Sequence, residues 1–197
     1  MQNKNAIILF TKNPELGKVK TRLAKTIGNE NALAIYKKLL QHTQSIVDPI
    51  DADKFVFYSD KINENDQWSN ANYYKKLQFN GDLGERMAAA FQEVFCLGYQ
   101  SVCIIGSDCY ELNSAIITEA FDKLVHFDTV IGPTFDGGYY LLGMNQLHEA
   151  LFQGKNWSTE TVFEETANDF KNFALSTYSL TKLTDIDEEK DLPEHWK

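Results

Sequence analysis

Short runs of apolar residues, bounded on both sides by polar ones, recur along the chain and predict buried strands. The first is Ala-Ile-Ile-Leu-Phe at 6–10, and the run at 101–106 has the same character. Runs that are apolar throughout are typical of strands buried on both faces, as in a parallel sheet. The predicted strands cover residues 6–10, 54–58, 101–106, 129–132 and 139–144, with weaker patterns at 73–79 and 174–178.

Apolar residues spaced three and four positions apart predict helices between these strands. The segment 31–47 carries such a stripe, which includes Tyr36. Asp82 followed by Glu85 has the pattern of a capping box, which predicts a helix start there. The expected N-terminal capping residues are Asp82, Asn113 and either Ser158 or Thr159, for helices that reach about residues 95, 125 and 170.

Strands and helices therefore alternate through most of the chain. This order predicts an α/β fold with a mostly parallel sheet and helices on both of its faces. A length of 197 residues fits one domain of ordinary size, and the sequence contains no internal repeat, low-complexity tract or linker-like stretch. We expect residues 1–197 to form a single domain.

The charge balance limits the partners of the protein. Nineteen Lys and Arg against 28 Asp and Glu give a formal net charge of −9. Binding of a nucleic acid duplex requires clustered basic residues, so no nucleic acid partner is expected. A polyanionic ligand would have to be held by a local group of cations.

Neither the apolar runs nor the cysteines indicate an exported or membrane protein. The longest early apolar run has five residues, whereas a signal peptide needs roughly 7–15 and a membrane helix about 20. The three cysteines are odd in number and lack CxxC spacing, which argues against a disulfide framework or a zinc site. We expect a soluble, cytoplasmic protein with no membrane span, and the oligomeric state stays open.

The candidate chemistry lies in three predicted loops. In open α/β sheets, ligands bind at the carboxyl ends of the strands. The loop 12–22 follows the first strand, Ser107-Asp108 follows the strand 101–106, and Asp136-Gly137-Gly138 follows the strand 129–132. We expect these loops to meet at one edge of the sheet.

The first loop concentrates positive charge in an acidic protein. Lys12, Lys18, Lys20 and Arg22 lie within eleven residues, and Gly17 allows the backbone to approach a ligand closely. This composition predicts a cradle for a polyphosphate, with a solvated basic turn as the alternative. The loop is neither a Walker A motif nor a GxGxxG fingerprint, since it lacks the required glycines.

Carboxylates and one aromatic residue follow the later strands. Asp108 comes directly after an apolar strand, where it either holds Mg²⁺ beside phosphates or closes a local turn. Asp136 either lies near the metal or the acceptor, with room for a ligand at the glycines, or forms an ordinary Asp-Gly turn. The acidic tail 185–191 is either solvated or supplies a second metal ligand. Trp157 either packs on the core or faces a ligand.

The order of these motifs resembles a bacterial glycosyltransferase-like family related to the MobA-like and phospholactate guanylyltransferase-like nucleotidyltransferases. The resemblance spans nearly the whole chain, and its segments are 10–14, 17–23, 81–87, 105–109, 132–140, 157–159 and 185–192. Two positions depart from the family pattern. Tyr110-Glu111 stand where a proline is usual, and Asn13 stands where a small residue is usual.

The resemblance implies a GT-A-like fold, the fold of nucleotide-diphospho-sugar transferases. It implies that Lys12, Lys20 and Arg22 contact the nucleotide phosphates, and that Asp108 binds the metal. By analogy with nucleotidyltransferases, Asp187 is a possible second metal ligand. The glycines expected at the donor are Gly17, Gly137 and Gly138.

The sequence thus predicts a transferase that depends on Mg²⁺ or Mn²⁺ and moves a group from a nucleotide or nucleotide-sugar donor to a small-molecule acceptor. The expected catalytic residues are Asp108, Asp136 and Arg22. Three functions remain open at this stage. They are glycosyl transfer, nucleotidyl transfer with release of pyrophosphate, and nucleotide binding without catalysis.

Overall fold

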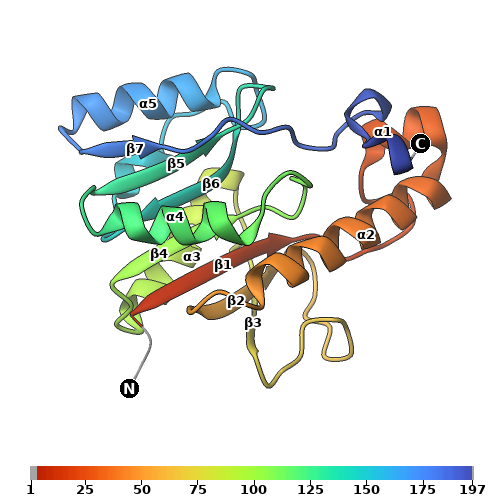
Figure 1. Ribbon diagram of the computed structural model, residues 1–197, viewed down its shortest axis with the longest axis horizontal. Helices are drawn as coiled ribbons and strands as arrows, with labels where there is room; N and C mark the ends of the chain where they lie inside the picture. Colours follow the sequence, from red (N-terminus) through yellow and green to blue (C-terminus); the bar gives the residue numbers. More distant parts are fainter. Residues whose placement is uncertain (1–3, 197) are drawn as a thin grey trace.

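The computed structural model describes residues 4–196 and shows one central sheet with helices around it (Figure 1). Within these residues, the sheet has seven strands in the order β3-β2-β1-β4-β6-β5-β7. Their bounds are β1 Asn5–Thr11, β2 Asp53–Tyr58, β3 Tyr73–Leu77, β4 Ser101–Ile105, β5 Thr129–Pro133, β6 Tyr139–Met144 and β7 Thr177–Ser179.

Most neighbouring strands are parallel. β1 pairs in parallel with β2 and β4, β2 with β3, and β5 with β7, whereas β6 is antiparallel to both β4 and β5. Because β6 is reversed between them, β4 and β5 point the same way, and the carboxyl ends of β1, β4 and β5 share one edge. The predicted mostly parallel α/β sheet is therefore confirmed.

Helices cover both faces of the sheet, as predicted. The bounds of the α-helices are α1 Thr21–Ile27, α2 Asn29–Val47, α3 Leu83–Cys96, α4 Ser114–Leu124 and α5 Val162–Asn172. The described part of the chain also contains three short 3₁₀ helices, η1 Glu149–Phe152, η2 Glu189–Asp191 and η3 Glu194–Trp196. Helices α2 and α4 pack on one face, and α3 and α5 pack on the other (Figure 1).

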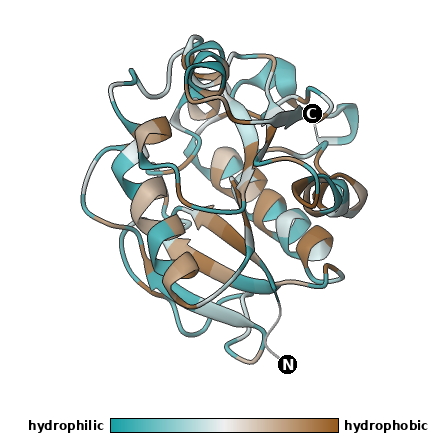
Figure 2. Ribbon diagram, turned by 90° about the vertical axis from the view of Figure 1, so that its left-hand side faces the viewer, coloured by the Kyte–Doolittle hydropathy of each residue, from teal (hydrophilic) through white to brown (hydrophobic). Residues whose placement is uncertain are grey.

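The apolar strands fit this arrangement because successive side chains point to opposite faces. In β1, Ile7 and Leu9 belong to the core under α2 and α4, while Ala6 and Ile8 belong to the core under α3. Figure 2 shows the hydrophobic residues on the central strands and on the helix faces turned toward them. A strand with both faces buried needs an apolar residue at every position, which is the pattern of 6–10.

Two predicted helix caps are confirmed. At the start of α3, the Asp82 carboxylate accepts a hydrogen bond from the Glu85 amide at 2.8 Å, and the Glu85 carboxylate accepts one from the Asp82 amide at 2.8 Å. At the start of α4, Asn113 Oδ1 accepts from the Ile116 amide at 3.2 Å. Both caps supply partners for amides that have none within the helix.

The structure differs from the predictions at two helix starts. Residues 21–27 form the short helix α1, whereas the whole segment 12–22 was predicted as a loop. The predicted caps Ser158 and Thr159 are wrong, because α5 begins at Val162 and Ser158 has φ +64°. A residue at this positive φ lies in the left-handed region, so residues 158–161 form a turn before the helix.

The buried cysteines bear on possible nucleophiles. Cys103 and Cys109 are buried and Cys96 is exposed, and all three are free thiols. Burial raises the pKa of the Cys103 and Cys109 thiols well above its ordinary value, so neither forms a thiolate readily at neutral pH.

Among the described helices, none combines the length and the apolar character that crossing a membrane requires.

Candidate active site

A cleft of about 720 Å³ opens at the carboxyl edge of β1, β4 and β5. It brings together loops that are far apart in the sequence, as expected for a sheet whose parallel strands end on one side. Its polar lining residues include Lys12, Lys20, Arg22, Asp108, Asp136, Asp185 and Asp187. The predicted meeting of the three loops at one edge therefore holds in the structure.

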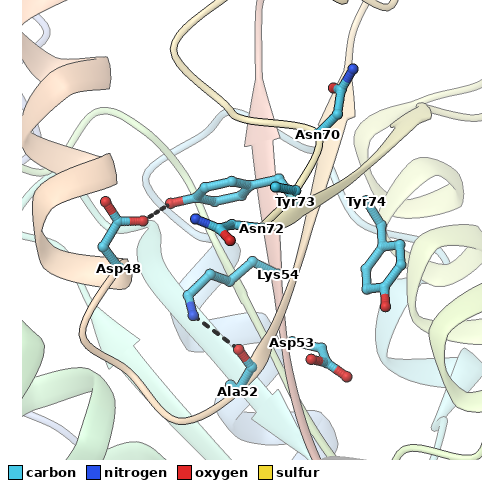
Figure 3. Close-up of a pocket in the computed structure, with 9 residues that line it drawn as sticks. Asp48, Ala52, Asp53, Lys54, Asn70, Asn72, Tyr73 and Tyr74 are labelled. Atoms are coloured by element: carbon cyan, nitrogen blue, oxygen red, sulfur yellow. Dashed lines mark hydrogen bonds between the residues drawn. The ribbon is translucent and has the colours of Figure 1, made fainter.

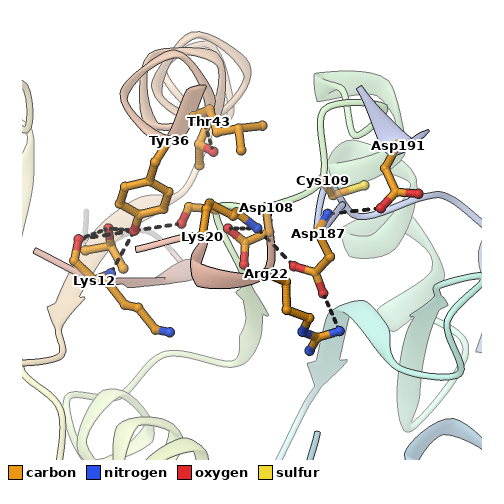
Figure 4. Close-up of polar contacts among 12 residues, drawn as sticks. Lys12, Lys20, Arg22, Tyr36, Thr43, Asp108, Cys109, Asp187 and Asp191 are labelled. Carbon is orange, nitrogen blue, oxygen red and sulfur yellow. Dashed lines mark hydrogen bonds and ion pairs between the residues drawn. The ribbon is translucent and has the colours of Figure 1, made fainter. Parts of the chain in front are cut away.

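Lys20 lies at the centre of the charged groups (Figure 4). Its ammonium Nζ is 2.9 Å from Asp108 Oδ1 and 3.3 Å from Asp187 Oδ1. Arg22 Nη1 is 3.3 Å from the other oxygen of Asp187. Lys20 itself has φ +48°, which turns the chain sharply just before α1, and only 5% of its side chain is exposed.

The electrostatics keep Lys20 charged. Burial alone would lower the pKa of Lys20, but the carboxylates of Asp108 and Asp187 oppose this and raise it above its ordinary value. The ammonium therefore stays protonated at neutral pH. It forms a fixed positive charge between two carboxylates at the floor of the cleft.

A strap formed by residues 180–187, here called the C-terminal strap, carries Asp187 to this point. The Leu183 amide donates to the Pro133 carbonyl at 3.1 Å, so the strap continues alongside β5 beyond the strand β7. The Ile186 amide then donates to the Asp108 carbonyl at 3.0 Å. Ile186 is buried among α1 and α2 residues, which fixes the acidic residues on either side of it.

Asp185 is a further carboxylate of the cleft, and the sequence analysis assigns it no role apart from the rest of the acidic tail. Its Oδ1 is buried and has no hydrogen-bond partner among the described residues. Burial, reinforced by the negative charges of Asp108 and Asp136, raises the pKa of Asp185 to about 7. A polar atom that is buried without a partner is costly, and such atoms are typical of sites that receive a ligand.

The hydroxyl of Tyr36 joins the β1 loop to the loop after β4. It accepts from the Lys12 amide at 2.9 Å, lies 3.1 Å from the Lys12 carbonyl, and contacts the hydroxyls of Thr11 at 3.2 Å and Ser107 at 3.3 Å. The sequence predicted Tyr36 only as one member of the apolar stripe of α2. The ring is in the core, but the hydroxyl positions the residues next to Asp108.

Replacing Tyr36 by phenylalanine is expected to lower kcat/KM roughly tenfold, because the two loops lose their shared anchor and catalytic groups tolerate little displacement. The free energy of unfolding should fall by about 1–3 kcal/mol, since the Lys12 amide loses its partner. Thr43→Val is the matched control, because Thr43 sits on α2 and its buried hydroxyl bonds only to the Leu39 carbonyl. Urea unfolding and steady-state kinetics on both variants separate the effects. Equal activity losses would show that Tyr36 acts through stability alone.

The Asp136 loop forms the predicted Asp-Gly turn and also borders the cleft. Asp136 Oδ1 accepts from the Thr134 hydroxyl and from the Gly138 amide at 3.1 Å, so it closes the β5–β6 turn. Its other oxygen has no hydrogen-bond partner among the described residues, and the side chain is exposed at the cleft. Gly138 also lines the cleft, whereas Gly137 does not and packs against the backbone of Glu160.

Gly137→Ala is expected to destabilise the protein by about 2–4 kcal/mol, because the residue has φ +90° and the new Cβ would lie 2.0 Å from the Glu160 carbonyl oxygen. Gly154→Ala is the control, since Gly154 also has positive φ but has no atom within 4 Å of an added Cβ. The strain of a left-handed residue is common to both variants. Thermal unfolding should therefore show a much larger loss for Gly137→Ala, and similar losses would rule out the contact with Glu160.

The other predicted cations and glycines divide between the cleft and the surface. Lys12 is exposed and lines the cleft. Lys18 does not line it, and its ammonium pairs with Glu15 at 2.6 Å instead. Gly17, at φ +74°, turns the loop next to Asn29 and is not a lining residue either.

Arg86 is a cleft residue that the sequence analysis includes only within the segment 81–87 of the resemblance. It lies in the first turns of α3, where its Nε donates to the Asp82 carbonyl at 3.2 Å and its Nη1 donates to Gln78 Oε1 at 3.1 Å. These bonds orient the guanidinium at the cleft. A cation on a helix that flanks the sheet has no local sequence signal that predicts this position.

The two departures from the family pattern lie outside the cleft. Asn13 is buried and ties the β1 loop to the end of β2, since its amide donates to the Lys61 carbonyl at 2.8 Å. Tyr110 packs its ring against His42 and Trp196, with ring centroids 4.7 and 4.4 Å away. Neither residue lines the cleft, so both departures concern the support of the loops.

A second hollow, of about 400 Å³, lies at the opposite edge of the sheet, where β2 and β3 begin (Figure 3). Its polar groups are already used within the protein. Lys54 Nζ donates to the Ile50 and Ala52 carbonyls at 3.0 Å each, and the Tyr73 hydroxyl donates to Asp48. The chemistry of the protein is therefore better placed in the larger cleft.

The donor set of the cleft fits a hard divalent cation. Asp108 and Asp187 both contact the Lys20 ammonium, so their carboxylates lie close together. Mg²⁺ is usually held by one or two carboxylates together with phosphate oxygens. Residues 4–196 contain no cluster of three or more His, Cys, Asp or Glu side chains arranged to hold a metal ion by themselves. These side chains thus suit a metal that arrives with a phosphate-bearing ligand.

Comparison with known proteins places the chain among its relatives. Residues 43–159 match the bacterial family described as uncharacterized protein conserved in bacteria (DUF2064). The chain belongs to this family. No curated protein shows significant similarity to the sequence.

One similar structure is that of a protein from Desulfovibrio desulfuricans G20 assigned as a nucleotide-diphospho-sugar transferase. It shares 32% sequence identity with a TM-score of 0.87, over 95% of this chain and 84% of the other. This similarity supports the prediction of a transferase, and it confirms for this DUF2064 member the predicted relation to glycosyltransferase-like proteins.

More distant structures share the fold. The 4-diphosphocytidyl-2C-methyl-D-erythritol synthase of Anaerococcus prevotii has 11% identity and a TM-score of 0.62, over 95% of this chain and 92% of the other. The inositol-1-phosphate CTP transferase of T. maritima has 12% identity and a TM-score of 0.59, over 98% and 92%. The protein thus has the GT-A-like fold of nucleotide-diphospho-sugar transferases, as predicted.

Proposed function

We propose that residues 1–197 act as one transferase domain that moves a glycosyl group from a nucleotide-diphospho-sugar to an acceptor, with Mg²⁺ or Mn²⁺ as cofactor. The observation that supports this most directly is the convergence of Lys20, Asp108 and Asp187 at the floor of the cleft. A buried cation beside two carboxylates suits a ligand made of phosphates and a divalent ion. Three free cysteines fit a cytoplasmic site of action.

The cations of the cleft would stabilise the diphosphate as it leaves. Lys20 is held in place by the carboxylates of Asp108 and Asp187. The planar guanidinium of Arg22 can bind two phosphate oxygens at once. Lys12 lines the same cleft, is exposed and forms no ion pair with a described residue. Electrostatic stabilisation by preorganised charges of this kind is usually the largest single contribution to catalysis.

Asp108 and Asp187 would hold the metal. When bound, the divalent ion neutralises negative charge on the diphosphate as the sugar–phosphate bond breaks. The protein controls this through the position of the carboxylates, which the strap and the loop after β4 fix against each other.

Asp136 would act on the acceptor. Its unpartnered oxygen can accept the proton of an acceptor hydroxyl while that hydroxyl oxygen bonds to the sugar carbon and the sugar–phosphate bond breaks. The hydrogen bonds to Asp136 Oδ1 fix the carboxylate on the β5–β6 turn. Asp136 is therefore proposed as the general base.

Nucleotidyl transfer is the second candidate, because two of the structures that share the fold are named as a cytidyl-compound synthase and a CTP transferase. In that reaction a phosphorylated acceptor attacks the α-phosphate of a nucleoside triphosphate, and pyrophosphate leaves. The same cations would stabilise either leaving group, so the products decide between the two reactions.

The deciding experiment supplies the protein and Mn²⁺ with UDP- and GDP-sugars and, separately, with each nucleoside triphosphate plus phosphorylated acids. Release of a nucleoside diphosphate supports glycosyl transfer, and release of pyrophosphate supports the second candidate. Tight nucleotide binding without turnover across a broad panel would favour a non-catalytic nucleotide-binding protein. Failure of both donor classes to bind in the presence of Mn²⁺ would contradict all three functions.

A further inference from the structure

The cations and the carboxylates that line the cleft come from different parts of the chain, and the lining residues from position 104 onward are here called the later wall. Its cations come from the first half of the chain and are Lys12, Lys20, Arg22 and Arg86. The lining residues from position 104 onward include no Lys, Arg or His among the residues that the structure describes. This later wall contributes the carboxylates Asp108, Asp136, Glu160, Asp185 and Asp187.

Two of these carboxylates are exposed and form no ion pair with a described residue. Asp108 and Asp187 pair with Lys20, and Asp187 pairs also with Arg22. Asp136 and Glu160, by contrast, form no ion pair with a described residue, and both are exposed. They lie on adjoining segments, because the Gly137 turn packs against the Glu160 backbone. An unneutralised acidic patch therefore borders the cleft at the end of β5, and β4 and β6 separate this strand from β1, whose loop carries Lys12.

We propose that this end of the cleft binds the acceptor, and that the acceptor is an uncharged or cationic molecule rich in hydroxyl groups. This inference rests on the proposed transferase function. Ionised carboxylates only accept hydrogen bonds, so they select ligands that donate them, such as hydroxyl or ammonium groups. A phosphate or carboxylate group on the acceptor would meet like charge on this wall with no cation to offset it.

The apolar part of the same end fits a ring or carbon chain. Trp157 lines it and packs its indole closely on Gly84, where an added Cβ would lie 2.6 Å from the ring. Tyr139 and Met87 line the cleft beside it. The Trp157 indole N–H is buried and has no hydrogen-bond partner among the described residues. An aromatic platform edged by carboxylates is a surface on which the C–H face of a polyol or sugar can rest while its hydroxyls donate outward.

The test is an acceptor panel with wild-type enzyme, a donor that binds, and Mn²⁺. It pairs glycerol with glycerol 3-phosphate, glucose with glucose 6-phosphate, and adds glucosamine. We expect kcat/KM for the neutral and cationic members to exceed that of their phosphate esters at least 30-fold. Glu160→Lys should shrink this ratio at least tenfold by improving the phosphorylated members, while donor affinity stays unchanged.

Glu164→Lys is the matched control, because it makes the same charge change at an exposed position of α5 that does not line the cleft. It should leave the ratio unaltered. Phosphate esters used as well as the neutral compounds, or a panel in which no neutral or cationic compound is used by an enzyme that binds its donor, would overturn the inference. Failure of the donor itself to bind with Mn²⁺ would instead contradict the proposed function.

Discussion

Replacing Lys20 by methionine is expected to lower kcat/KM by roughly 10²–10³-fold, because it removes a preorganised buried charge at which two carboxylates converge. Methionine has an unbranched side chain of similar length, so it occupies the space of the lysine side chain at the turn before α1. Most of the loss should appear in kcat, since the charge on the leaving diphosphate grows as the bond breaks. Steady-state kinetics with saturating donor measures this.

The same variant tests the electrostatics of the cleft. Without the ammonium, Asp108 and Asp187 face each other with only Arg22 to offset them, so the free energy of unfolding should fall. The carboxylates are 45% and 31% exposed, and solvent screening therefore limits the loss to about 1–2 kcal/mol. Mn²⁺ should restore thermal stability to this variant more than to the wild type, because the metal then meets no competing cation.

Lys18→Met is the control for both measurements, since Lys18 pairs with Glu15 on the surface and does not line the cleft. It should leave activity and metal response unchanged. Activity of Lys20→Met within tenfold of the wild type would contradict the placement of Lys20 at the leaving diphosphate.

Asp108→Asn should remove most of the Mn²⁺-dependent affinity for nucleotide and lower kcat/KM by at least about 10²-fold, since an amide oxygen is a far weaker ligand for a hard cation than a carboxylate. The fold should survive, because the bond from the Ile186 amide uses the Asp108 backbone carbonyl. Calorimetric titration of nucleotide with and without Mn²⁺ gives the metal-dependent part directly.

Asp122→Asn, an exposed change on α4 away from the cleft, serves as the control for charge and expression. It should bind nucleotide and metal as the wild type does. A folded Asp108→Asn protein whose nucleotide affinity still rises with Mn²⁺ would exclude Asp108 as a metal ligand and would shift that role to Asp187 or Asp185.

The sheet and most helices were predictable because their signals are local. A strand buried on both faces, such as 6–10, must be apolar throughout, and a capping box such as Asp82 with Glu85 is readable over four residues. The start of α5 was mispredicted for a local reason as well. Ser158 has the side chain of a capping residue, but its left-handed backbone belongs to the turn before the helix.

The candidate site was predictable in part. Lys20 and Asp108 could be assigned to one edge of the sheet, because each follows a strand and parallel strands end together. The depth of Asp185 and the cleft position of Arg86 depend on packing between distant segments, which leaves no pattern along the sequence. The role of Tyr36 was missed for a different reason. A tyrosine on an apolar stripe predicts that its ring is buried, but the pattern does not indicate what its hydroxyl bonds to.

The contact between Lys20 and Asp187 joins residues 167 positions apart along the chain. The strap that carries Asp187 also bonds to β5 and to the loop after β4, and Leu183 and Ile186 within it are buried in the hydrophobic cores. Detachment of residues 180–187 would take Asp187 away from the Lys20 ammonium, while Asp108 stayed in place after β4. The charged centre of the cleft is therefore assembled only when the last part of the chain has docked against the first.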